Sequence, residues 1–411
     1  MKKIIQASEK TFSRLKITES ELKAHKIAPS NLLHVESDEG LELQVDKPKR
    51  VVVKKAEILK KFNSTKFVEK FHEAMKDKVV GYAFQIRKNG APHQTIIWNW
   101  SRTHADGGKG WTLDTRMHIA SVSKMITGIA IYNLLLDKGI SVDALIHSYL
   151  PSYWTKGPNV SQITFRHLLN HTSGFNTGDS KSDFSTMKSM VKNGVALTGD
   201  VSLGKGKYAN MNFGLCRILI PIINGDISKN EDYKELTQLG INIDVLWDAF
   251  SIAEYKDYVQ KKVLTPAGVA SAGFNPRPLI DAIAYKFPAT TAKGWDSGKL
   301  GSMSGGAAWR LSINEVLQVM HHVKRKGTIL TSTQAEYLLE NSLGLDWDVE
   351  TPAGKWYSKN GRWANSSRTE QCVAAFLPGG YEMVIFVNSP IGSQGEDLMT
   401  KAYETFLSSL D

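Results

Sequence analysis

The alternation of apolar and polar residues predicts β-structure near both ends of the chain. A period of two marks four segments: 79–87, 94–100, 371–377 and 382–388. The turn pair Asn89–Gly90 separates the first two segments and is a strong hairpin signal. We therefore expect an α+β protein in which both ends of the chain build one antiparallel sheet.

A spacing of three and four residues between apolar positions predicts helices in the remaining parts of the chain. It marks the segments 65–75, 126–136, 215–223, 248–263, 312–324 and 395–410. Thr164 is placed to cap a further short helix. This order predicts a sheet region (about 75–120 and 300–411) flanked by helices, and a mainly helical region (121–299). Residues 63–411 would form this core, and residues 1–62 an accessory N-terminal segment.

Composition excludes several classes of function. The net charge is +10, and residues 1–78 supply +6 of it (18 Lys and Arg against 12 Asp and Glu). The signs are mixed there, without arginine clusters or interleaved aromatic residues, so we expect no nucleic-acid partner. The sequence contains no run of about 18 apolar residues, so we expect no membrane span. The first ten residues lack the apolar stretch of a secretory signal, so we expect a cytoplasmic protein. Cys216 and Cys372 stand in apolar surroundings, which favours reduced, buried thiols.

The candidate nucleophile lies at the start of the longest apolar helical pattern. Ser121 and Lys124 are three residues apart, so their side chains would share one helical face. A serine hydroxyl needs a neighbouring base, and a lysine can serve when burial lowers its pKa. The same Ser-x-x-Lys spacing occurs six times, starting at Ser13, Ser20, Ser121, Ser185, Ser189 and Ser202. Only the copy at Ser121 opens a long apolar helix, and this context selects it.

Five motifs in order make the chain similar to a known superfamily. They are Ser121-x-x-Lys124, Leu168-Leu169-Asn170-His171-Thr172-Ser173-Gly174, Tyr208-x-Asn210, Gly305-Gly306 and Lys359-Asn360-Gly361. Across roughly residues 75–411, the chain resembles the serine β-lactamase and penicillin-binding protein superfamily, in particular its class C β-lactamase and family VIII esterase branch. The resemblance implies a β-lactamase-like fold.

The resemblance also implies catalytic roles for the first motifs. Ser121 would attack a carbonyl group and become acylated, and Lys124 and Tyr208 would share the proton transfers. Which of these two is the base stays open. Asn210 would bind the group beside the scissile bond. His171 is more simply explained as a structural residue of its turn, although it could line the cleft.

The last motif would complete the substrate site. The resemblance places Lys359, Asn360 and Gly361 against the substrate, with Lys359 keeping the site electropositive and attracting a substrate carboxylate. The backbone N–H groups of Ser121 and Arg362 would form the oxyanion hole. Asn360 stands where threonine or serine is usual, and the bulky Arg362 follows where small residues are common.

These features favour a serine hydrolase that cleaves a small ester or amide through an acyl-enzyme on Ser121. It would need no metal or other cofactor, and its partner would be the small-molecule substrate. Two alternatives remain open: a β-lactamase or D-alanyl-D-alanine carboxypeptidase, and a penicillin-binding-like sensor or inactive scaffold. The sequence leaves the oligomeric state open, homo-oligomer included.

Overall fold

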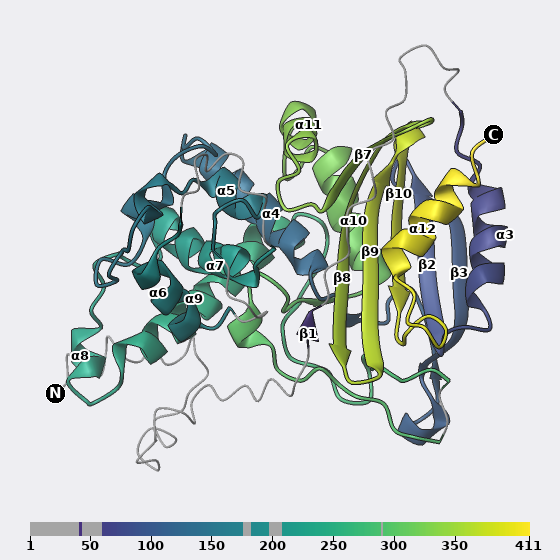
Figure 1. The fold of residues 1–411 in the computed structure, drawn as a ribbon, viewed down its shortest axis with the longest axis horizontal. Helices are drawn as coiled ribbons and strands as arrows, with labels where there is room; N and C mark the ends of the chain where they lie inside the picture. The colour runs from purple at the N-terminus through teal and green to yellow at the C-terminus, as the bar shows by residue number, and fades with distance from the viewer. Residues whose placement is uncertain (1–40, 43–59, 176–181, 197–207, 289–290) are drawn as a thin grey trace.

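The computed structural model describes residues 41–42, 60–175, 182–196, 208–288 and 291–411 of the 411-residue chain (Figure 1). Its central element is an eight-stranded sheet in the order β1-β8-β9-β10-β2-β3-β4, with β7 paired to β8. All of these pairings are antiparallel. The strands span Leu41–Glu42 (β1), Gly81–Lys88 (β2), Ala91–Arg102 (β3), Lys109–Gly110 (β4), Trp347–Thr351 (β7), Gly354–Asn365 (β8), Arg368–Leu377 (β9) and Tyr381–Val387 (β10). A small second sheet pairs β5 (Met117–His118) with β6 (Arg310–Leu311).

The prediction that both ends of the chain share one sheet is confirmed. Strand β10 lies between β9 and β2, and Val384 pairs with Ala374 on one side and Gln85 on the other. The hairpin of β2 and β3 turns at Asn89 and Gly90, whose φ angles are 52° and 82°. Two successive positive φ angles match the right-handed twist of the flanking strands, which explains the Asn-Gly pair.

Helices cover both faces of the sheet (Figure 1). The helices are α3 (Ser64–Met75), α4 (Val122–Asp137), α5 (Phe165–Leu169), α6 (Phe184–Asn193), α7 (Asn210–Asn224), α8 (Lys234–Thr237), α9 (Ile243–Val259), α10 (Ile313–Lys324), α11 (Ser332–Glu340) and α12 (Leu398–Leu407). Helices α3 and α12 pack on one face through an apolar cluster that includes Phe67, Trp356 and Phe406. Helices α4 and α10 pack on the other face, in the larger cluster that continues into the helical region.

Several predicted helix boundaries follow from capping residues. Ser312 and Glu315 form the reciprocal capping box that the sequence predicts at the start of α10. Thr164 caps α5 in the same way, with His167 in place of an acidic partner. The sequence patterns did not predict helix α11 or the strand pair β7–β8, although β8 carries the Lys359 motif.

Most of the predicted accessory segment 1–62 lies outside the described residues. Within it, Leu41 and Glu42 form β1 against Ala364 and Trp363 of β8. Phe62 bridges to Leu410, which places the start of the core beside the C-terminus. Within the described parts of the chain, no helix is long and apolar enough to cross a bilayer. Cys216 and Cys372 are buried free thiols, as predicted.

Candidate active site

The chain turns sharply before the candidate nucleophile. Ala120 has φ 45°, in the left-handed region, between β5 and the start of α4. A non-glycine residue held in this region stores strain, a feature that clusters at functional sites. The turn makes Ser121 the residue that precedes the first turn of α4, with its side chain free of the capping role that serines usually have there. Its hydroxyl is therefore available to other groups.

Lys124 lies one helical turn further and is fully buried. Its ammonium group donates hydrogen bonds to Ser121 Oγ, to Asn210 Oδ1 at 2.5 Å and to the carbonyl oxygen of Gly306 at 3.1 Å. The ammonium also lies 4.8 Å from the centre of the Tyr208 ring. We call the side of the site formed by α4 and the start of α7 the helical wall. The contacts hold the lysine side chain in this wall, with its nitrogen beside the serine oxygen.

Tyr208 and Asn210 enter from the start of α7, and Tyr208 is 87 residues along the chain from the serine. The Tyr208 hydroxyl lies 2.6 Å from Ser121 Oγ, so the two hydroxyl groups are hydrogen-bonded. Asn210 is the first residue of α7 and is buried beside Lys124. The helix start thus brings both a phenol and an amide to the lysine.

His171 supports this helix start. Its ring stacks on the Tyr208 ring with centroids 4.1 Å apart. Its Nδ1 lies 3.3 Å from the Ala209 N–H and 3.2 Å from Asn212 Nδ2, so the ring accepts both hydrogen bonds as a neutral imidazole. Burial lowers the pKa of His171 well below its ordinary value, and two neighbouring lysine ammonium groups lower it further. The histidine therefore orients the tyrosine segment without adding charge.

Gly305 and Gly306 pack between the start of α7 and Lys124. Gly305 has φ 89° and packs directly on the backbone of Phe213 in α7, where a β-carbon would clash. This close approach brings the Gly306 carbonyl to Lys124, and Thr127 donates to the Gly305 carbonyl at 2.6 Å. The glycine pair thus joins α4 and α7 through backbone oxygens.

Strand β8 forms the opposite wall, and Gly361 sets its distance from the nucleophile. A β-carbon at Gly361 would lie 2.9 Å from the backbone nitrogen of Ser121 and against the carbonyl of Ile119. Any side chain there would force the strand and the helix start apart. The glycine is therefore required by the close approach of two backbones.

The backbone of β8 presents polar groups beside this contact. Asn360 N–H donates to Asp346 Oδ2 at 3.2 Å, on the side of β8 that faces away from β9. Backbone groups of strand residues two apart point in the same direction, so the Arg362 N–H points off the same edge. Among the described residues, β7 covers this edge only as far as Ser358, and β1 covers it from Trp363. The N–H group of Arg362 therefore points into the stretch of this edge between β7 and β1, next to Gly361.

The side chains of Asn360 and Arg362 take the other direction. Ser358, which is on the same face by strand alternation, contacts Met399 of α12 at 3.6 Å. Arg362 Nη2 lies 3.5 Å from the carbonyl of Gly395, before α12. The side chains of both predicted residues therefore lie on the far face of the sheet, and only their backbone groups lie beside the site.

Lys359 points into the site but is held by a carboxylate. Its ammonium lies 3.5 Å from the Tyr208 hydroxyl and 2.6 Å from Asp346 Oδ2. The lysine side chain is 1% exposed and that of Asp346 is 13% exposed. Asp346 belongs to no motif, so the sequence does not single it out. It directly precedes β7, and it meets Lys359 because β7 pairs with β8.

Two other Ser-x-x-Lys copies, at Ser185 and Ser189, lie among the described residues, and both are on α6. Lys188 forms an ion pair with Asp244 at 2.8 Å, and the Ser185 hydroxyl donates to Asp183. The copies at Ser13, Ser20 and Ser202 lie outside the described residues. Within the described residues, no cluster of three or more histidine, cysteine, aspartate or glutamate side chains is arranged to hold a metal ion.

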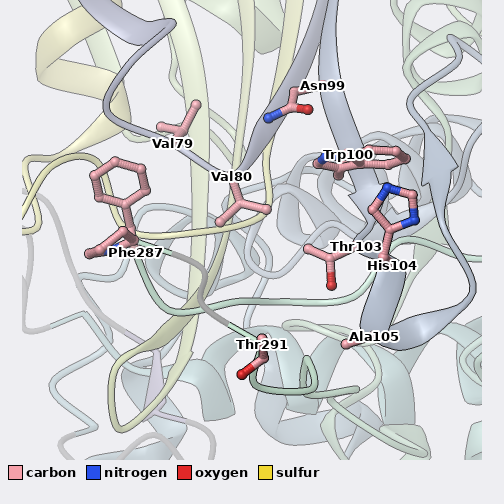
Figure 2. A pocket seen from close by; sticks show the side chains of 10 residues that line it. Val79, Val80, Asn99, Trp100, Thr103, His104, Ala105, Phe287 and Thr291 are labelled. Atoms are coloured by element: carbon pink, nitrogen blue, oxygen red, sulfur yellow. The ribbon is translucent and has the colours of Figure 1, made fainter.

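A separate cavity of about 690 Å³ lies at the end of the β2–β3 hairpin (Figure 2). Its lining is mainly apolar and includes Val79, Val80 and Phe287. The rings of Trp100 and His104 contact each other at its rim, with centroids 4.6 Å apart. None of the residues around Ser121 lines this cavity.

The architecture and the site together define a β-lactamase-like fold, and comparison with known proteins agrees. Residues 67–227 match the family model described as Beta-lactamase. The resemblance expected from the five motifs is confirmed at this level.

One curated relative is Esterase EstB of Burkholderia gladioli, 32% identical over 88 residues. That match spans 20% of this chain and 22% of the relative's length. Among solved structures, D-amino acid amidase from Ochrobactrum anthropi SV3 has a TM-score of 0.60 at 16% identity, covering 84% of this chain and 98% of that one. The octameric penicillin-binding protein homologue from Pyrococcus abyssi has a TM-score of 0.59 at 16% identity, covering 82% and 74%. At these identities the structural likenesses show the fold.

Proposed function

We propose that this protein is a serine hydrolase that cleaves a small ester or amide through an acyl-enzyme on Ser121. One observation carries the proposal: Lys124 Nζ and Tyr208 OH converge on Ser121 Oγ from two different helices. A hydroxyl that contacts both an amine and a phenol has the proton acceptors that nucleophilic attack requires. The match to Esterase EstB and the amidase-like fold support an ester or amide substrate.

In the proposed reaction the serine oxygen attacks the substrate carbonyl carbon, and the serine proton passes to the Lys124–Tyr208 pair. The carbonyl oxygen becomes an oxyanion between the N–H groups of Ser121 and Arg362, which Gly361 brings together. The pair then returns a proton to the leaving alcohol or amine, and the acyl group stays on Ser121. Water repeats the sequence and releases the acid.

The two proton carriers have different surroundings. Lys124 is fully buried and donates to an amide oxygen and a backbone carbonyl. The ring of Tyr208 lies 4.8 Å from the Lys124 nitrogen, and its hydroxyl lies 3.5 Å from the Lys359 nitrogen. Because the Lys124 nitrogen and the Tyr208 hydroxyl both contact Ser121 Oγ, we treat the two side chains as one coupled unit.

The test combines labelling with turnover. We expect a fluorophosphonate to add one adduct at Ser121, detected by intact mass and peptide mapping, and the protein to hydrolyse p-nitrophenyl butyrate. Ser121→Ala removes both signals, while Ser185→Ala, at a Ser-x-x-Lys copy on α6, keeps them. A folded wild-type protein with neither adduct nor turnover would contradict the proposal.

A further inference from the structure

The charge of Lys359 is balanced inside the protein. Asp346 Oδ2 lies 2.6 Å from the lysine nitrogen and also accepts the Asn360 N–H. Both side chains are largely removed from solvent, so salt screens their interaction little. A substrate beside Ser121 would therefore meet the dipole of the Lys359–Asp346 ion pair in place of a full positive charge.

Close backbone packing holds Asp346 in this position. A β-carbon at Gly344 would lie 2.9 Å from the carbonyl oxygen of Lys124, and one at Gly128 would lie 2.8 Å from that of Leu343. The segment before Asp346 therefore rests directly on α4. The Asp346 N–H also donates to the Ser358 carbonyl at 2.9 Å, which fixes the carboxylate beside β8.

The other cation of this strand does not replace the lost charge. The Arg362 guanidinium lies on the α12 side of the sheet, 3.5 Å from the Gly395 carbonyl. The strand wall thus holds one ammonium and one carboxylate in contact, beside the backbone N–H groups of β8. Because the two charges are 2.6 Å apart, a substrate carboxylate that approaches Lys359 also approaches Asp346, and attraction and repulsion offset each other.

We propose that Asp346, acting through Lys359, makes the site selective for uncharged acyl substrates and disfavours those that carry a carboxylate beside the scissile bond. This inference rests on the proposed function and names its substrate class. Asp346 itself touches no reacting atom; it sets how much of the lysine charge a substrate meets.

A pair of esters with acyl chains of four carbons tests this charge preference. The probes are p-nitrophenyl butyrate, which is neutral, and mono-p-nitrophenyl succinate, which ends in a carboxylate. We expect the wild-type protein to have a kcat/KM for the butyrate ester at least about tenfold above that for the succinate ester, since specificity is a ratio of these constants. Comparable values for the two esters would overturn the inference without any variant.

Asp346→Asn removes the charge and keeps an oxygen that can accept the Asn360 N–H. We expect it to raise the succinate-to-butyrate ratio of kcat/KM by about tenfold or more, mainly through a lower KM for the succinate ester. Asp346→Glu restores a carboxylate and should return the ratio toward the wild-type value, which a merely structural role would not do.

Asp244→Asn is the matched control. Asp244 also forms an ion pair with a lysine, Lys188, at 2.8 Å, but at the start of α9 in the helical region. It should leave the ester ratio unchanged. An unchanged ratio in a folded Asp346→Asn protein that still hydrolyses the butyrate ester would refute the role of Asp346 and leave the proposed function intact. Absence of both turnover and Ser121 labelling in the wild type would instead refute the proposed function, and this inference with it.

Discussion

The two walls of the site each contribute one buried lysine, and the lysines have different partners. In the helical wall, Lys124 donates to a hydroxyl, an amide oxygen and a backbone carbonyl. In the strand wall, Lys359 donates to the carboxylate of Asp346. Both ammonium groups approach the ring of Tyr208, at 4.8 Å and 5.4 Å from its centre.

The contrast separates two uses of one side chain. Lys124 meets uncharged oxygens in its hydrogen bonds to Ser121, Asn210 and Gly306, whereas Lys359 forms an ion pair with Asp346. Under the proposed function, the helical wall carries the proton transfers, and the strand wall positions the substrate and selects its charge.

Removing each lysine tests this division most strongly. We expect Lys124→Met to lower kcat by about 10²–10⁴, the usual contribution of an acid/base group. Lys359→Met alone would leave Asp346 buried and unpaired, so the fair comparison is the double variant Lys359→Met with Asp346→Asn. We expect that double variant to lose about tenfold to a hundredfold, because it removes a charge near Tyr208 and no proton carrier.

Steady-state kinetics on the butyrate ester measures both losses, with circular dichroism as the check on folding. Equal losses for the two lysines would contradict the division of roles.

The distance between the walls is the next target. Gly361→Ala places a methyl group against the Ser121 backbone nitrogen, so the strand must move away from α4. We expect a loss of about 10² in kcat/KM, the size found when reacting groups are displaced by roughly 1 Å. Gly110→Ala in β4 is the control, because the nearest atom to its new β-carbon is the Asn99 carbonyl oxygen at 3.7 Å.

A further measurement distinguishes displacement from unfolding. Gly361→Ala should still bind covalent label at Ser121, but at a reduced rate. An unchanged kcat/KM would mean that the strand does not supply the oxyanion hole.

The smallest expected effect is on stability and concerns a buried carboxyl group of the same sheet, Glu382, which lacks hydrogen-bond donors. Glu382 is 1% exposed, neither of its oxygens has a hydrogen-bond partner, and Arg325 Nε lies 3.8 Å away. Burial raises the pKa of Glu382 from 4.5 to about 7, against the lowering influence of two arginines. Between these pH values the folded state therefore binds more protons than the unfolded state. The stability that depends on protonated Glu382 is lost as the pH rises through about 7.

We expect Glu382→Gln to raise the free energy of unfolding at pH 8.5 by about 1–3 kcal/mol relative to the wild type, with a much smaller change at pH 5. Urea denaturation at the two pH values measures this difference. Esterase activity should stay near that of the wild type, since Glu382 pairs with β2 and β9 at the centre of the sheet. Equal effects at both pH values would show that the carboxyl group is not the source.

Local patterns in the sequence determined much of the fold. The Asn89–Gly90 turn, the capping box of α10 and the apolar face of α4 each depend on residues within a few positions of one another, where backbone geometry decides the outcome. The spacing of Ser121 and Lys124 belongs to the same class, because three residues along a helix always share a face. The choice among six such pairs also came from a local feature, the apolar run after Ser121.

Only the tertiary structure decided what each candidate residue meets. Tyr208 reaches Ser121 across 87 residues because two glycines let α4 and α7 approach, and Asp346 meets Lys359 because β7 pairs with β8 in one register. The same register turns the side chains of Asn360 and Arg362 away from the cleft and leaves their N–H groups at its edge. Such contacts depend on packing between distant segments, so the sequence alone determined the nucleophile's helix, and the folded chain decided the charge of the site around it.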